Sequence, residues 1–226
     1  MLTFKTPLAY RLTVIIMTMG ISVFWSTPLA ASDNMDHSTR HHSADEHAAH
    51  RQMKNQAGYT RKESSYQIPS VSLTDQHGQK VTVDDVLGGN DPVILNFIFT
   101  TCTTICPVLS ASFAQLQKKY ASDLTGVHMV SITIDPEHDT PAKLREYAQK
   151  FGASENWTFL TGNLNDVHDV LKAFEAYRGD KMSHIPLTFL RTSSEDSWVR
   201  LEGFASASDL MREYRTQTSK AVSGES

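Results

Sequence analysis

The sequence has few cysteines, little net charge and no long apolar segment. Two cysteines in 226 residues do not supply the four clustered ligands that a structural zinc module needs. The formal net charge is −4, so no basic field points to nucleic acid as a partner. Hydrophobic residues make up 40% and charged residues 20% of the chain, which is typical of a soluble globular core.

The N-terminus has the pattern of a secretory signal. Lys5 and a second basic residue precede an uncharged, largely apolar run at 12–25, shorter than the roughly 20 residues that span a bilayer. Small residues around Ala31 offer a cleavage site, and no cysteine lies near it, which excludes an N-terminal lipoprotein. We expect residues 1–31 to be a signal peptide, with an uncleaved inner-membrane anchor as the alternative. Either reading predicts a periplasmic or otherwise extracytoplasmic protein.

The segment after the signal is rich in histidine and methionine. Residues 32–63 are polar and aperiodic, so we expect them to be disordered. Half of the chain's histidines fall inside this tract: His37, His41, His42, His47 and His50. Imidazole suits copper, and a flexible tract can wrap around an ion. The tract is therefore predicted to be an auxiliary metal site of low specificity, with a solvated spacer as the alternative.

From residue 64 onward the hydrophobic spacing becomes regular. It predicts a single domain over 64–218, without internal repeats, and a flexible tail over 219–226. Strands are expected at 71–73, 81–83, 93–99, 127–134, 157–160, 187–190 and 198–201, and helices at 109–120, 141–151, 167–174 and 206–214.

This order of elements predicts an α/β fold. An N-terminal β-hairpin is followed by alternating strands and helices, which favours a central, mostly parallel sheet with helices on both faces. The late strand–strand–helix unit at 187–214 makes the arrangement thioredoxin-like rather than doubly wound. Ligand chemistry in such sheets gathers at the carboxyl ends of the strands, and Cys102 follows the end of the strand at 93–99.

The two cysteines lie where a helix begins. Pro107 suits the first turn of a helix, so Cys102 and Cys106 are expected near its positive N-terminal end. That position favours the thiolate and prepares the pair to bind a metal or to attack a disulfide. The alternative is a permanent disulfide that closes a very short loop and stabilises the fold only weakly.

A histidine far along the chain completes the predicted site. Two thiolates are soft ligands that suit Cu(I) and leave a position for a third donor. His184 precedes the strand at 187–190, and in a thioredoxin-like sheet this loop faces the first helix's N-terminus. We therefore predict a site for copper, as Cu(I) or Cu(II), formed by Cys102, Cys106 and His184. The alternative is that His184 is an ordinary loop residue.

Three motifs carry a resemblance to a known family. They are the Cys-x-x-x-Cys-Pro segment at 102–107, the segment Ser-Ile-Thr-Ile-Asp-Pro-Glu-His-Asp-Thr-Pro at 131–141, and His184. Together and in this order they resemble the Sco/SenC family of copper-binding assembly factors for cytochrome oxidase, over roughly residues 66–216. Family members commonly have Pro-Asp after the first cysteine, whereas this chain has threonines at 103–104.

The resemblance implies a thioredoxin fold that binds one copper and delivers it, or electrons, to a cuproprotein. The implied acceptor is the dinuclear copper centre of cytochrome oxidase subunit II. The resemblance also places Asp135 near the cysteines, where a carboxylate orients a ligand or relays a proton. The alternative for Asp135 is to cap the turn that leads into the next helix.

A copper chaperone of this kind is not an enzyme, and an enzyme is the competing hypothesis. In that hypothesis the protein is a periplasmic thiol–disulfide oxidoreductase in which Cys102 and Cys106 are the redox-active pair, reset by a thiol reductant. Three residues separate the cysteines, whereas thioredoxins usually have two, which favours metal binding. No nucleic-acid partner is expected. Membrane contact is expected only through an uncleaved N-terminal segment or a membrane-bound client.

Overall fold

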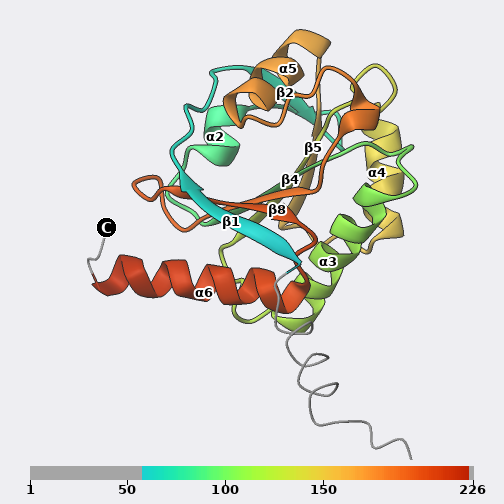
Figure 1. The fold of residues 1–226 in the computed structure, drawn as a ribbon. Helices are drawn as coiled ribbons and strands as arrows, with labels where there is room; N and C mark the ends of the chain where they lie inside the picture. Colours follow the sequence, from blue (N-terminus) through green and yellow to red (C-terminus); the bar gives the residue numbers. More distant parts are fainter. Residues whose placement is uncertain (1–57, 224–226) are drawn as a thin grey trace, which may run out of the picture. The chain divides into compact units, whose positions relative to one another are not determined.

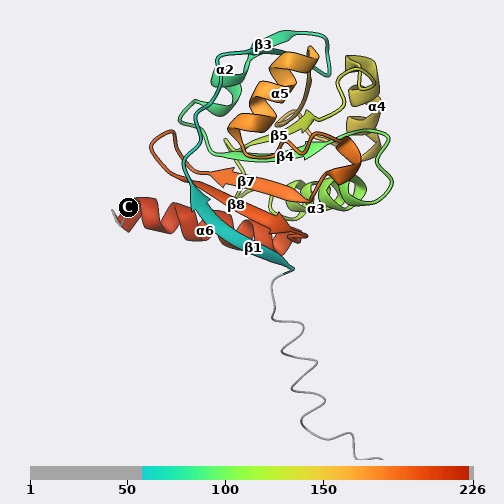
Figure 2. The same ribbon diagram turned by 45° about the horizontal axis from the view of Figure 1, so that its top comes forward.

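The structure, a computed structural model, describes residues 58–223. The expected signal at 1–31 and the five tract histidines lie outside the described residues. The domain contains an eight-stranded sheet with the strand order β1-β8-β7-β4-β5-β6-β2-β3 (Figures 1 and 2). Its strands are β1 (Tyr59–Ser64), β2 (Ser72–Asp75), β3 (Lys80–Thr82), β4 (Val93–Ile98), β5 (His128–Thr133), β6 (Trp157–Thr161), β7 (Leu187–Arg191) and β8 (Trp198–Gly203). Its helices are α2 (Val83–Leu87), α3 (Ile105–Lys119), α4 (Pro141–Lys150), α5 (Leu164–Ala173), the 3₁₀ helix η1 (Lys181–Ser183) and α6 (Ala207–Ser223).

Helices cover both faces of the sheet, as the sequence predicts. α3, α4 and α6 pack on one face, and α2 and α5 pack on the other (Figures 1 and 2). The side chains of β4 alternate between these two clusters, with Ile94 and Ile98 in the first and Leu95 and Phe97 in the second. All six residues of β4 are buried, which explains why this strand reads as a continuous apolar run.

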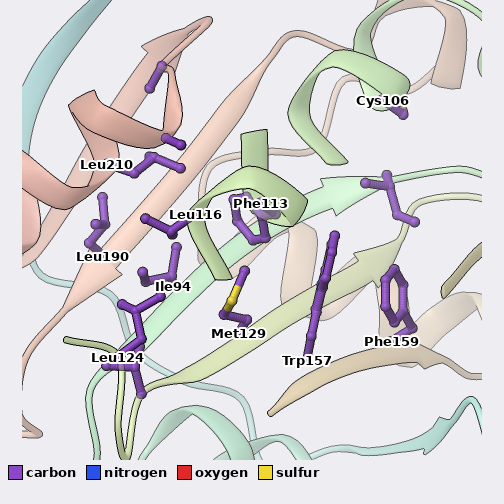
Figure 3. Close-up of a cluster of buried hydrophobic side chains, with 14 of the residues drawn as sticks. Ile94, Cys106, Phe113, Leu116, Leu124, Met129, Trp157, Phe159, Leu190 and Leu210 are labelled. Atoms are coloured by element: carbon purple, nitrogen blue, oxygen red, sulfur yellow. The ribbon is translucent and has the colours of Figure 1, made fainter. Parts of the chain in front are cut away.

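The cluster beneath α3 extends to the cysteine site. Figure 3 shows Phe113 and Leu116 of α3 above Ile94 and Met129 of the sheet, while Cys106 lies at the margin of the cluster, where the helix begins. The sulfur of Cys106 is therefore supported by the same core that holds the sheet together. None of the helices in the part of the chain that the structure describes is long and apolar enough to cross a membrane.

The sheet differs from the prediction in the direction of its strands. Within the described residues only the pairs β4–β5 and β5–β6 are parallel, and the other neighbours are antiparallel. The physical reason is the connection between strands. α3 and α4 are crossovers, which parallel pairing requires, whereas β2–β3 and β7–β8 are joined by short turns that reverse the chain. The prediction of a mostly parallel sheet was therefore wrong, although the helices on both faces and the β2–β3 hairpin are confirmed.

The ends of the domain also differ from the expected boundaries at 64 and 218. β1 starts at Tyr59, inside the segment expected to be disordered, and pairs along its length with β8. Its mostly exposed polar sequence is typical of an edge strand, which composition does not distinguish from a polar linker. Tyr59 Oη and Arg61 Nε donate to Glu213 of α6 at 2.6 and 2.8 Å. α6 itself continues to Ser223, into the expected tail.

The sequence analysis also missed the short helix α2. Thr82 ends β3, and its hydroxyl accepts a hydrogen bond from the backbone N–H of Asp85, which caps the helix. Thr-Val-Asp-Asp is a recognisable helix start, but the β-branched residues at 81–83 favour the strand interpretation. Val83 and Leu87 are buried against the second cluster, so tertiary packing decides between the two.

A buried polar chain links the central strands. Trp157 Nε1 donates to Ser131 Oγ at 2.9 Å, and Ser131 Oγ donates to Asn96 Oδ1 at 2.6 Å. None of these three side chains is exposed by even 1%. Ser131 therefore pairs a donor on one neighbouring strand and an acceptor on the other, and both are shielded from solvent.

We predict that Ser131→Ala lowers the free energy of unfolding by about 3 kcal/mol, because it leaves a buried donor and a buried acceptor unpaired. Urea unfolding followed by tryptophan fluorescence measures this loss. Ser122→Ala, at an exposed serine, is the control and should change stability by less than about 0.5 kcal/mol. Equal stabilities of the two variants would show that this chain of hydrogen bonds does not contribute to the free energy of unfolding.

Candidate functional site

The cysteine pair spans the N-terminus of α3. Cys106 is the second residue of the helix and is fully buried, while Cys102 precedes the helix and is partly exposed. The backbone N–H of Cys106 points to Cys102 Sγ at 3.4 Å, and that of Phe99 points to Cys106 Sγ at 3.4 Å. Both sulfurs thus lie at amide donors, one from the first turn of α3 and one from the residue that follows β4. Both cysteines are free thiols in the structure.

The two thiols differ in acidity. Partial burial of Cys102 acts to raise its pKa, but hydrogen bonds from the backbone N–H groups of Cys106 and Thr104, with contacts to their side chains, outweigh burial and lower the pKa. Burial raises the pKa of Cys106 far above its ordinary value, although the Phe99 N–H opposes this. Cys102 is therefore the accessible, more readily ionised sulfur, and Cys106 is held as the thiol in the metal-free protein.

Thr104 occupies a position where the Sco/SenC pattern commonly has an acidic residue. Its hydroxyl lies 3.9 Å from Cys102 Sγ, and its contacts lower the pKa of that thiol. A carboxylate at the same place would repel a neighbouring thiolate. The departure from the family pattern thus makes the surroundings of Cys102 more favourable to its ionised form.

A buried carboxylate fixes the segment that leads to the cysteines. Asp139, which has no exposed surface, accepts hydrogen bonds from the Thr100 N–H at 3.0 Å, the Thr100 hydroxyl at 2.5 Å and the Thr133 hydroxyl at 2.6 Å. Thr100 follows β4 and Thr133 ends β5, so the carboxylate ties together the carboxyl ends of two adjacent parallel strands. A buried charge with this many donors holds its neighbours firmly.

His184 lies directly after η1 and is buried, with 7% of its surface exposed. Its ring meets the ring of Phe99 at 6.3 Å between centroids and 78° between planes. Burial lowers the pKa of His184 to about 4, and an interaction with the Phe97 backbone opposes the shift only in part. The imidazole is therefore neutral near pH 7. Its Nε2 has no hydrogen-bond partner in the part of the chain that the structure describes, which is unusual for a buried polar atom.

The three predicted ligands all lie near Phe99 in the structure, but they do not form a metal site together. The Phe99 backbone contacts Cys106 Sγ, while its ring contacts His184. Within residues 58–223, however, no three His, Cys, Asp or Glu side chains are grouped closely enough to hold one metal ion. A cavity of about 40 Å³ beside His184 is lined also by Lys181 and His168. This is room for about one water molecule, so the packing beside His184 leaves a small void.

Asp135 has a different partner from the one expected. Its carboxylate, 12% exposed, forms an ion pair with Lys181 Nζ at 2.5 Å, and within residues 58–223 it makes no hydrogen bond with a cysteine. The hydroxyl of Thr140, not Asp135, caps α4. Asp135 thus connects the end of β5 to the loop that carries His184.

Sequence reasoning missed three residues of this region. Asp139, Thr100 and Lys181 make the contacts that hold the two ligand-bearing segments. One signal for Asp139 was available, because Thr140-Pro141 already supplies the cap of α4 and leaves the preceding carboxylate without a local role. Nothing in the sequence pairs Lys181 with Asp135.

Relatives were found by sequence. The family model described as SCO1/SenC matches residues 60–217. The SCO1 protein homolog of Bacillus subtilis is 34% identical over 115 residues, which is 50% of this chain and 58% of that protein. The chain spans about half the length of the first sequence relatives that it matches.

Solved structures are similar in fold. A SCO1/SenC family lipoprotein from Bacillus anthracis is 26% identical with a TM-score of 0.59, covering 70% of this chain and 98% of that one. Copper-bound ScoI from Arabidopsis thaliana is 26% identical with a TM-score of 0.56, covering 66% and 96%.

These neighbours confirm the predicted thioredoxin-like fold with helices on both faces of the sheet. The matched segment includes β1, both cysteines, Asp135 and His184, and extends into α6. The resemblance seen in the three sequence motifs is thereby confirmed, and the chain belongs to the SCO1/SenC family.

Proposed function

We propose that this protein is exported, binds one copper ion through Cys102, Cys106 and His184, and delivers it to a cuproprotein. The acceptor proposed is the dinuclear copper centre of cytochrome oxidase subunit II. One solved neighbour is described as a copper-bound Sco protein and another as a member of a family of cytochrome c oxidase assembly proteins. Export rests on the signal pattern at 1–31.

The observation that carries the proposal is the unpaired Nε2 of His184. A buried ring nitrogen normally has a hydrogen-bond partner, yet Nε2 has none among the described residues, and the ring stays neutral because burial lowers the pKa of His184 to about 4. A neutral ring nitrogen with a free lone pair is the form that binds metals. It lies against Phe99, whose N–H meets the sulfur of Cys106.

The donor set fits copper in both valences. Two thiolates suit Cu(I), and an imidazole adds the nitrogen that Cu(II) favours. Cys102, partly exposed and more acidic, is the sulfur available to an incoming or departing ion. Cys106 has to lose its proton to become a ligand, so binding releases a proton and is pH-dependent. Delivery then proceeds by exchange of these ligands for those of the acceptor.

The proposal also includes the histidines of the N-terminal tract and a contact with the membrane. His37, His41, His42, His47 and His50 are proposed as an auxiliary site of low specificity. Contact with the membrane is proposed through an uncleaved N-terminal segment or through a membrane-bound client.

We predict that the chain with its five tract histidines replaced by asparagine binds one copper ion. His184→Ala should weaken Cu(II) binding by at least about tenfold and Cu(I) binding much less, because two thiolates still hold the soft ion. Competition titrations with a Cu(I) chelator and a Cu(II) chelator measure both affinities.

The control variant in this titration is His77→Ala, which changes an exposed histidine in the β2–β3 turn and should leave both affinities unchanged. Cys102→Ser should remove tight binding of both valences. An unchanged copper affinity of Cys102→Ser would exclude the proposed site.

A second candidate function is favoured by the asymmetry of the thiols. The Cys102 thiolate would attack a client disulfide, forming a mixed disulfide and releasing one client sulfur as a thiolate. Cys106, after losing its proton, would then attack Cys102 Sγ, releasing the reduced client and leaving a Cys102–Cys106 disulfide. This two-electron reduction needs a thiol reductant to restore the pair. A partly exposed, more acidic cysteine beside a buried one fits this order of attack.

For this candidate we predict that Cys106→Ser stops at the mixed disulfide, because the second attack is removed. Mass spectrometry of the metal-free variant with a disulfide peptide should detect the adduct at Cys102, whereas the unaltered protein should release reduced peptide. Release of reduced peptide at the same rate by both proteins would rule out the dithiol pathway.

The contacts of Thr104 generate a separate prediction about pH. Because they lower the pKa of Cys102 below its ordinary value, Thr104→Val should move the alkylation profile of Cys102 to higher pH. At pH 7 alkylation by iodoacetamide should then be about two- to fivefold slower, since less thiolate is present. Thr103→Val, at an exposed neighbour, is the matched control. Identical profiles for all three proteins would assign the low pKa to the backbone alone.

A further inference from the structure

The loop between β5 and α4, residues 134–140, contacts both segments that carry the proposed ligands. At its C-terminal end, Asp139 holds Thr100, next to the cysteine segment. At its N-terminal end, Asp135 holds Lys181, three residues before His184. Two of the three carboxylates in this loop, those of Asp135 and Asp139, are therefore each bonded to a different half of the site.

The base of this loop is rigid. The Asp135 N–H donates to the Thr133 hydroxyl at 2.9 Å, and the Asp135 carbonyl accepts from the N–H groups of His138 and Asp139 at 3.1 and 2.9 Å. The Asp139 side chain is buried with three hydrogen bonds. The carboxylate of Asp135 is thus presented from a fixed turn, so a partner bound to it has a defined position.

Lys181 connects the fixed turn at Asp135 to His184. Lys181 begins η1, and its carbonyl accepts the His184 N–H at 3.2 Å. The ammonium group also lies 5.8 Å from the centroid of the Phe99 ring, the ring that His184 meets edge-on. Lys181, Phe99 and His184 are therefore in one contact group. A small cavity lies beside His184, and the ion pair ties the start of η1 to the end of β5.

We propose that Lys181 and Asp135 are positioning residues that hold His184 ready to complete the copper site. This inference rests on the proposed function. Because the three ligands are not yet grouped, His184 has to move towards the cysteines, and a tethered loop loses less conformational freedom when it does so. The ion pair between Lys181 and Asp135 affects only the position of the nitrogen ligand. It should therefore strengthen the binding of Cu(II), which needs that ligand, and leave the binding of Cu(I) unchanged, because two thiolates hold Cu(I).

The test uses the full chain with the five tract histidines replaced by asparagine. Lys181→Met keeps the aliphatic stem and removes the charge. We expect it to weaken Cu(II) binding by about two- to fivefold, as for a partly exposed ion pair, and to leave Cu(I) binding unchanged. Electron paramagnetic resonance should show a smaller fraction of bound Cu(II) with a histidine nitrogen ligand. The thermal midpoint of the metal-free protein should not change, which separates positioning from folding.

The matched control is Lys172→Met. It removes the same charge from a lysine near the same loop, one that pairs with Asp169 at 3.8 Å and lies over Tyr177 rather than Phe99. It should bind Cu(II) like the parent. Asp135→Asn should weaken Cu(II) binding as Lys181→Met does, and the double variant should be no weaker than either single variant, because both changes break one contact.

The outcomes separate this inference from the proposed function. If the parent protein does not bind copper, the proposed function fails. If the parent binds Cu(II) through His184 but Lys181→Met binds it equally well, the positioning role is refuted. Additive losses in the double variant would also refute it, because they would mean that the two residues act independently.

Discussion

The buried carboxylate of Asp139 is the contact on which the geometry of this site depends. It joins Thr100, after β4, to Thr133, at the end of β5, with three hydrogen bonds and no exposure to water. Parallel strands place their carboxyl ends at one edge of the sheet, but they do not fix the loops that follow. Asp139 fixes the first of these loops, and with it the segment from which Cys102 and Cys106 extend. A buried carboxylate without hydrogen bonds would cost free energy, so these bonds stabilise the observed conformation of the loop.

The surroundings of the three proposed ligands favour a different protonation state for each sulfur and a neutral histidine. The helix N-terminus supplies N–H groups that favour the Cys102 thiolate, while the core that buries Cys106 favours its thiol. The same kind of burial keeps the imidazole of His184 neutral. The two proposed functions, metal binding and disulfide exchange, both require such a division, because each needs one accessible sulfur and a second, less reactive one. What separates the two functions is the histidine, which only the metal needs as a ligand.

Much of the fold and part of the site were predictable from local pattern. The apolar run of β4, the helical spacing of α3 and the Thr-Pro start of α4 led to correct elements because each is set by nearby residues. The strand directions and β1 were not predictable in this way. β1 is polar and exposed, and it is a strand because β8 and Glu213 bind it. The sheet is less parallel than expected because short turns reverse the chain at β2–β3 and β7–β8.

The sequence by itself determined the chemistry. Three motifs in order identify the family, and two cysteines at a helix start with one histidine before a late strand predict the donors of the proposed site, because residue identity and spacing carry that information. Tertiary structure alone decided the placement. It buried one sulfur and exposed the other, left Nε2 of His184 without a partner, and paired Asp135 with Lys181, forty-six positions along the chain. Such contacts join segments whose distance in the sequence says nothing of their distance in space, so only the folded core sets them.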